Sequence, residues 1–426
     1  MNNAPTQPQA LSANTTAFSW WREAPRPAKK ALVAASLGWM LDSFDVMLYS
    51  LVLASLMADL HLSKGTAGIL GSVTLLAAAA GGLSFGIIAD CFGRTRALMA
   101  SVLIYAIFTA ACGLAHNFVQ LAVFRILLGL GMGGEWASGA SLVSETWPAE
   151  HRGKALGFMQ SSWAIGYALA ALVVAVVLPL AGWRAVFFVG VLPAFITLWI
   201  RRGVEEPELW KSTRTAVSST FGGFAELFRG PLLQSTIVLT LMNACCLFAW
   251  WGFNLWVPAY LSLPVAQGGI GLTSTAMSVV VIVMQIGMWF GYITFGFVSD
   301  VVGRKKTYIT YLIAASALLF VFGTTRTPLL LLILGPFVAL FGTGYYTGFA
   351  AVTAETYDTR IRATAQGFTY NTGRIVSAAA PFTVGSLAQR HGFGAAFAVG
   401  ALSFLLAAFF WIWIPETKGR RLAAEN

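Results

Sequence analysis

Twelve apolar segments dominate the sequence, each roughly 18 residues or longer, which is enough to cross the hydrocarbon layer of a bilayer as a helix. Short polar loops separate most of them. The sequence therefore predicts an all-α membrane protein with twelve transmembrane helices. We place the segments at residues 31–58, 66–89, 97–115, 118–146, 154–179, 183–201, 232–262, 272–299, 307–323, 328–356, 364–388 and 394–414.

The composition supports this class. Of the 426 residues, 57% are hydrophobic and only 10% are charged, against about 25% charged in soluble domains. A soluble chain of this length could not bury so much apolar side chain. This excludes a soluble enzyme, a disordered chain and a fibrous one. The four cysteines show no C-x-x-C spacing, so neither a zinc site nor a disulfide framework is expected.

Two bundles of six helices are predicted, at residues 31–201 and 232–414. A charged linker rich in Ser and Thr, residues 202–231, separates them. Residues 1–30 lack the order of a signal peptide and are expected to form a disordered cytoplasmic tail. Residues 415–426 form a second cytoplasmic tail.

The basic residues predict the orientation. Arg125 and Arg374 lie inside predicted spans, and 21 of the other Lys and Arg residues fall on the side that holds both termini. Cytoplasmic loops carry such an excess, so both termini are expected in the cytoplasm, with the chain in the bacterial plasma (inner) membrane. The net charge of +10 then reflects loops, and no nucleic-acid partner is expected. The basic residues of the opposite side are Lys64, Arg184, Arg326 and Arg390.

The two predicted bundles repeat each other. Residues 86–96 (GIIADCFGRTR) recur 210 residues later as 296–306 (GFVSDVVGRKK), and residues 145–152 recur at the same offset as 355–362. Pro207-Glu208 recurs 208 residues later as Pro415-Glu416. A shared offset indicates duplication, and six-helix repeats are a transporter architecture with substrate held between the halves.

These motifs resemble the major facilitator superfamily, and the resemblance spans about residues 30–420. Its loop between helices 2 and 3 matches at Gly86, Asp90, Gly93, Arg94 and Arg96. The second copy matches at Gly296, Asp300, Gly303, Arg304 and Lys306. The basic residue usual after Gly-Arg is replaced by Thr95 in the first copy. The resemblance implies the twelve-helix major facilitator fold, with transport by alternating access.

Residues 124–136 (FRILLGLGMGGEW), followed by residues 145–148 (ETWP), resemble the sialate:proton symporter family, which includes lactate-type carboxylate permeases. Residues 38–45 (GWMLDSFD) resemble the D-G-F-D stretch of proton symporters for organic acids. This resemblance implies proton-coupled uptake of a small organic anion, such as a monocarboxylate or sialate. The ending Pro415-Glu416-Thr417-Lys418-Gly419 instead resembles sugar porters. A proton-coupled sugar or aromatic-acid symporter is therefore the alternative, followed by drug efflux and by a membrane sensor.

Five ionisable residues lie at membrane depth, away from the ends of the predicted spans: Asp42, Asp45, Arg125, Glu135 and Arg374. Each costs about 2.5–3.5 kcal/mol at a helix centre, so such residues normally face an aqueous cavity or a partner. Asp42 and Asp45 share a helix face with Gly38 and Tyr49, and two such close carboxylates repel when both are ionised. We interpret the pair as proton carriers; the alternative is a capping or packing role near a kink.

The other three ionisable residues have open roles. By resemblance, Arg125 faces Asp45 in a pair that protonation opens. Glu135 is either a second proton site or a tie from helix 4 to a neighbour. Arg374 is a candidate clamp for the substrate carboxylate; the alternatives are pairing with an acid and snorkelling to the interface.

Polar residues on the inner helix faces complete the predicted substrate site, although interhelical hydrogen bonding would explain each of them equally well. The other Trp and Tyr residues are expected mainly in interfacial belts. The site is predicted from Tyr49, Arg125, Gln160, Asn243, Trp250, Asn254, Gln285, Asn371 and Arg374.

By resemblance, both Gly-Arg loops belong to a cytoplasmic gate whose charge networks break on inward opening. Glu145, Arg152, Glu355 and Arg362 are the charged partners at the ends of neighbouring helices. No P-loop, metal cluster or nucleophile–base constellation stands out. We therefore expect no enzyme activity and no cofactor, with the proton as coupling ion. The expected partners are the lipid bilayer, protons and an organic anion, and the chain is expected to work as a monomer.

Overall fold

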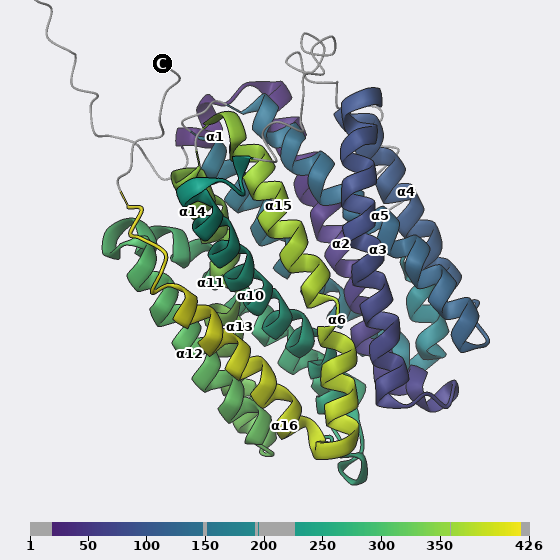
Figure 1. The fold of residues 1–426 in the computed structure, drawn as a ribbon. Coiled ribbons are helices and arrows are strands. Elements are labelled where there is room, and N and C mark those ends of the chain that lie inside the picture. Colours follow the sequence, from purple (N-terminus) through teal and green to yellow (C-terminus); the bar gives the residue numbers. More distant parts are fainter. Residues whose placement is uncertain (1–18, 148–150, 192–194, 196–225, 358, 419–426) are drawn as a thin grey trace, which may run out of the picture.

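The structure is a computed structural model that describes residues 19–147, 151–191, 195, 226–357 and 359–418. All regular structure in these residues is helical (Figure 1). The first half contains α1 (Ser19–Glu23), α2 (Arg26–Asp59), α3 (Lys64–Phe92), α4 (Arg94–Cys112), α5 (Phe118–Thr146) and α6 (Arg152–Val189).

The second half follows the linker, of which residues 202–225 lie outside the described residues. It contains α10 (Gly230–Ser262), the 3-10 turn η1 (Val265–Gln267), α11 (Ser274–Val302), α12 (Arg304–Thr324), α13 (Pro328–Thr343), α14 (Tyr345–Thr356), α15 (Thr359–Ser377) and α16 (Ala380–Phe410).

Glycine turns explain how ten long apolar helices provide twelve spans. Two of the ten, Lys154–Val189 and Thr364–Phe410, each combine two predicted spans. The second has 47 residues and would be about 70 Å long if straight, more than twice the bilayer core of about 30 Å. Gly182 (φ 75°, ψ 176°) and Gly392 (φ 80°, ψ 168°) reverse the chain inside them. These glycines are 210 residues apart, so the turn is duplicated too. The prediction of twelve spans in two repeats is confirmed.

Two predicted spans are not continuous helices. Span 328–356 divides between α13 and α14 at Gly344, and span 364–388 divides between α15 and α16. The second break precedes Pro381, which has no N–H to continue the helix ladder. Because the break comes soon after Arg374, that residue lies in the last turn of α15.

The halves lie side by side, with the purple and blue helices of the first next to the green and yellow helices of the second (Figure 1). Contacts between them run through α2 with α10, α3 with α16, and α6 with α11. We call the end of the molecule with Gly93, Gly303 and the C-terminal segment the terminal end. The opposite end holds His61, Gly182 and Gly392.

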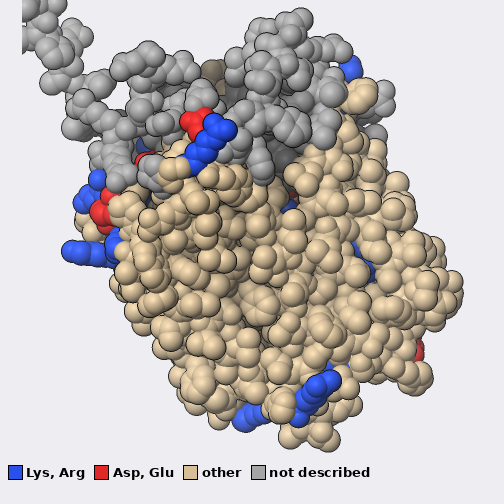
Figure 2. Space-filling view, viewed as in Figure 1, with Lys and Arg blue, Asp and Glu red and all other residues tan. Residues whose placement is uncertain are grey.

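The surface is divided as a bilayer requires. Figure 2 shows mostly uncharged side chains over the middle of this face, with Lys, Arg, Asp and Glu gathered towards its two ends. Large apolar side chains such as Leu83, Leu172 and Phe290 are exposed, as lipid-facing residues would be. The protein is therefore a multi-pass membrane protein.

Candidate functional site

A small cavity lies between the halves. Its volume is about 20 Å³, room for a single water molecule, so its walls almost meet. Both halves contribute to it. The lining residues are Trp39, Met132, Gln160 and Trp163 of the first half and Trp250, Trp251, Tyr292, Tyr346, Tyr370 and Arg374 of the second.

Aromatic rings form most of this wall. The centroids of Trp39 and Trp163 are 4.6 Å apart, and Trp251 meets Trp163 edge-on at 6.1 Å. Tyr292 and Tyr346 meet on the other side at 6.3 Å. Such surfaces suit a flat apolar body, because rings prefer offset or edge-to-face contacts at these distances. The prediction that the remaining Trp and Tyr residues form interfacial belts is wrong for Trp39, Trp163, Trp251 and Tyr346, whereas Tyr292 lies in the wall as its position on the helix face suggested. Several occupy mid-helix positions that periodicity alone could not assign to the cavity.

Arg374 is the cationic residue of this wall. Its side chain is buried and forms no ion pair within the described part of the chain. Asp42, from the other half, is the acid with which it interacts electrostatically. A buried guanidinium without a bound carboxylate is suited to receive one in a forked contact.

Three buried carboxyl groups lie next to the cavity. Asp42, Asp45 and Glu135 are each 0% exposed, and none of their oxygens has a hydrogen-bond partner among the described residues. Glu135 packs against α2 so closely that a Cβ at Gly38 would lie 2.5 Å from Oε1. Tyr105 lies within electrostatic range of all three. Such a cluster is stable only when protons or another cation neutralise it.

Arg125 has different partners from those implied by the resemblance. Its guanidinium stacks on the Tyr49 ring at 4.0 Å, and Nε donates to Thr74 Oγ1 at 3.0 Å. The structure shows no ion pair with Asp45 within the described residues, so that predicted contact is corrected. The reason is register: Tyr49 lies one helical turn beyond Asp45 on α2 and reaches the guanidinium first.

The predicted polar residues divide into two groups. Gln160, Trp250 and Arg374 line the cavity. The others form hydrogen bonds within their own helix or to a neighbouring one, so their assignment to the substrate site stays a prediction. Asn243 donates to the Thr369 carbonyl, and Tyr49 donates to the Ala67 carbonyl. Asn254 donates to Met47 Sδ. Gln285 donates to the Val281 carbonyl and Asn371 to the Gly367 carbonyl, each within its own helix.

The halves meet directly towards the opposite end. Ser50 donates to the carbonyls of Asn254 (3.2 Å) and Leu255 (2.7 Å). Lys64 Nζ donates to the Gln267 carbonyl at 2.6 Å. Towards the surface, a vestibule of about 840 Å³ is lined by α2, α6, α10 and the start of α11. The Ser50 contacts lie between this vestibule and the cavity, and they close the interface of α2 with α10.

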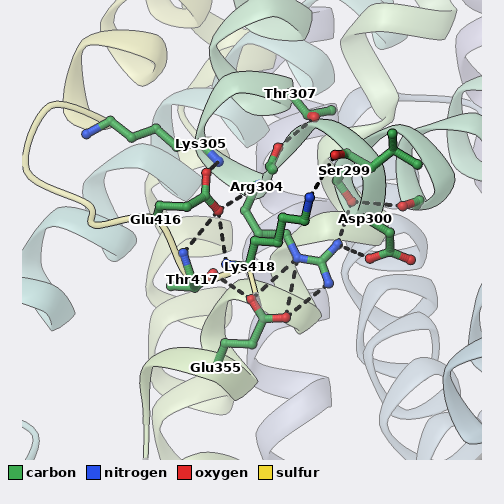
Figure 3. A network of polar contacts seen from close by, with 12 residues as sticks. Ser299, Asp300, Arg304, Lys305, Thr307, Glu355, Glu416, Thr417 and Lys418 are labelled. Carbon is green, nitrogen blue, oxygen red and sulfur yellow. Dashed lines mark hydrogen bonds and ion pairs between the residues drawn. The ribbon is translucent and has the colours of Figure 1, made fainter. Parts of the chain in front are cut away.

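The second-half gate motif forms a charge network at the terminal end (Figure 3). Arg304 pairs with Asp300 at 2.5 Å and with Glu355 at 3.0 Å. Gly303, which precedes Arg304, has a φ of 112°, and Gly93 in the first half has the same φ. Lys306 is exposed. The contacts of Gly86, Asp90, Arg94, Glu145, Arg152 and Arg362 lie outside what the structure describes.

The C-terminal segment, which the sequence places in a cytoplasmic tail and not in the gate, completes this network. Glu416 accepts hydrogen bonds from the backbone N–H groups of Arg304 (2.8 Å) and Lys305 (3.2 Å) at the start of α12. Thr417 donates to Glu355 at 2.5 Å. The carboxylate thus occupies a helix N-terminus, where negative charge is favoured. The repeated Pro-Glu pair was the available signal.

Two six-helix halves with a small, mainly aromatic cavity between them are the arrangement of a transporter that holds its substrate between the halves. The chain matches the Major Facilitator Superfamily over residues 35–294 and 261–426. It belongs to that superfamily, whose members are transporters and not enzymes.

Curated relatives support this at full length. The cis,cis-muconate transport protein of Acinetobacter baylyi is 33% identical, over 92% of this chain and 95% of the relative. The sialic acid transporter NanX of Escherichia coli is 32% identical, over 92% and 96%. Among solved structures, a D-xylose-proton symporter superposes with a TM-score of 0.77 at 21% identity, over 93% of this chain and all of the other. That likeness concerns the fold.

Proposed function

We propose that this protein is a proton-coupled importer of a small organic anion with a flat, unsaturated or aromatic body. The observation that carries the proposal is the cavity itself, in which aromatic walls surround one buried arginine, Arg374. Two relatives are named as transporters of carboxylic acids, muconate and sialic acid, which supports an anionic substrate. Aromatic walls favour the flat acid over lactate or sialate.

Coupling follows from the position of Asp42. Asp42 and Arg374 come from different halves and interact electrostatically. A substrate carboxylate on Arg374 replaces that interaction, which leaves Asp42 to be neutralised by a proton. Asp45 and Glu135 extend the proton-binding cluster. Substrate and proton therefore load together, and the neutralised site can change its access.

Energetics favour this coupling. A monoanion that enters a cell against the membrane potential costs about 2.3 kcal/mol per 100 mV, and one proton cancels that charge. The pH gradient then adds to the driving force. We place both termini in the cytoplasm of a bacterial inner membrane because of the Lys and Arg excess at that end.

Uptake into proteoliposomes tests the proposal. An inside-alkaline gradient should accelerate uptake of at least one acid in a panel of benzoate, muconate, lactate and sialate. If no member of the panel responds, proton-coupled anion import is wrong.

A proton-coupled sugar symporter is the second candidate, because the C-terminal Pro415-Glu416-Thr417-Lys418-Gly419 resembles sugar porters. Arg374 separates the two candidates, since a neutral sugar gives a buried guanidinium no counter-charge. An Arg374→Gln protein that binds its substrate normally would favour the sugar.

A further inference from the structure

The cavity contains an unused hydrogen-bond donor besides Arg374. Trp39 lines the cavity and is 5% exposed. Its indole Nε1 is buried and has no acceptor among the described residues. Tryptophan can only donate at this atom, and a buried donor without a partner is destabilising. In a residue that lines a binding cavity, such an atom can be satisfied by an acceptor on a bound molecule.

The position of Trp39 relates this donor to the arginine. Asp42 lies three residues after Trp39 on α2, so the two side chains share a helix face. Asp42 is also the acid that interacts with Arg374 across the interface. Trp39 and Arg374 both line the cavity, one from each half. The Trp163 ring packs against Trp39 at 4.6 Å with an interplanar angle of 49° and fixes the ring.

We infer that the indole N–H of Trp39 is the second anchor of the substrate carboxylate, which bridges it to Arg374. This inference rests on the proposed function. A carboxylate has enough lone pairs to accept from both donors at once. Because the donors belong to different halves, the bridging anion holds the halves together, and closure around the site requires a carboxylate.

A carboxamide of the same shape distinguishes this anchor from mere packing. Its oxygen is uncharged and its NH₂ group donates, so it cannot serve both donors as a carboxylate does. Wild-type protein should therefore prefer benzoate over benzamide. A hydrogen bond to a charged group contributes about 1.5–3 kcal/mol, or roughly tenfold to a hundredfold in affinity. Trp39→Phe should reduce the benzoate:benzamide affinity ratio by about that factor.

The experiment measures binding of both probes to purified full-length protein, for the wild type and for Trp39→Phe. Because the ratio is taken within one protein, it does not depend on how much of each sample is folded. Trp251→Phe is the matched control, a change of the same kind in the same wall. It should weaken both probes alike and leave the ratio unchanged. Trp39→Gln, which keeps an N–H donor, should restore part of the ratio and serves where Trp39→Phe does not fold.

Each remaining outcome decides the matter. If wild-type protein binds no benzoate, the proposed substrate class does not include this probe. The inference about Trp39, which rests on that class, is then overturned as well. If it binds benzoate and the ratio survives in Trp39→Phe, only the Trp39 anchor is overturned. If the ratio is lost in Trp251→Phe instead, the donor is the indole of Trp251 and not that of Trp39. That result would also overturn the inference.

Discussion

Asp45 offers a direct test of coupling at the scale of one residue. Asp45→Asn keeps the shape of the side chain but cannot bind and release a proton. We expect gradient-driven accumulation to fall at least about a hundredfold, the lower end of the usual scale for losing a positioned proton-transfer group. Counterflow of substrate, which needs no net proton movement, should persist. Uptake into proteoliposomes measures both.

Asp59→Asn is the control for that variant. Asp59 lies at the end of the same helix, where it forms a half-exposed ion pair with Arg184 at 2.8 Å. Surface pairs of this kind contribute little, so transport should be close to normal. Full accumulation by Asp45→Asn would remove Asp45 from the mechanism.

The sequence could identify the buried charges but not their partners. Charge inside an apolar span predicted the burial of Asp42, Asp45, Glu135 and Arg374, and each is buried. It could not predict that Arg125 would stack on Tyr49, because a shift of one turn along α2 changes the partner. Trp39 was missed because a tryptophan in an apolar span fits a lipid interface as well as a cavity.

At the scale of elements, the reversing glycines provide a prediction about stability. Backbone angles near φ 75° and ψ 176° are essentially restricted to glycine and cost other residues about 1–3 kcal/mol. Gly182→Ala and Gly392→Ala should therefore each lower the thermal midpoint of the purified protein. Gly157→Ala is the control, because it is helical and a Cβ there meets nothing within 4 Å. It should be neutral or slightly stabilising. Equal midpoints for all three would contradict this account.

Helix boundaries were predictable where composition changes and not where a helix breaks inside an apolar segment. Most spans agree with the described helices within a few residues. The turns at Gly182 and Gly392 fall in the gaps predicted at residues 180–182 and 389–393. The breaks at Gly344 and before Pro381 were not predicted. Each falls inside a continuous apolar segment, so hydropathy does not mark it.

The C-terminal segment provides a pH prediction. Partial burial alone would raise the pKa of Glu416, but N–H donation from Lys418, Arg304, Lys305 and Thr417 lowers it below its ordinary value. A lowered folded-state pKa stabilises the protein above the ordinary glutamate pKa of about 4.3, and this stabilisation is lost as pH falls through the lowered value. Glu416→Gln should thus be less stable than wild type at neutral pH, and the difference should shrink in acid.

Thermal midpoints of both proteins at a series of pH values from neutral to strongly acid measure this difference. Lys306→Gln is the control, because Lys306 is an exposed residue of the same helix start and should show no such trend. A Glu416→Gln difference that grows in acid would reverse the predicted sign and contradict the assigned hydrogen bonds.

The duplication is a property of the whole molecule. The offset of 210 residues joins the two Gly-Arg loops and the two reversing glycines, so both halves have the same plan. The functional groups do not follow it. Carboxyl groups gather in the first half, whereas the cavity arginine belongs to the second. This division makes transport depend on contact between the halves, which the repeated motifs alone do not reveal.

Gly68 tests the movement of one half against the other. A Cβ there would lie 2.5 Å from the Pro381 carbonyl oxygen of the other half, so Gly68→Val cannot close the opposite end as the structure shows it. Alternating access requires that closure, and uptake should therefore be abolished.

Ser50, which is fully buried in the closed interface, should become accessible. A Ser50→Cys protein without its native cysteines should react with a membrane-impermeant maleimide only when Gly68→Val is also present. Gly157→Val, at an open position, should leave Ser50→Cys unreactive and uptake intact. Normal uptake by Gly68→Val would show that this contact is not part of the transport cycle.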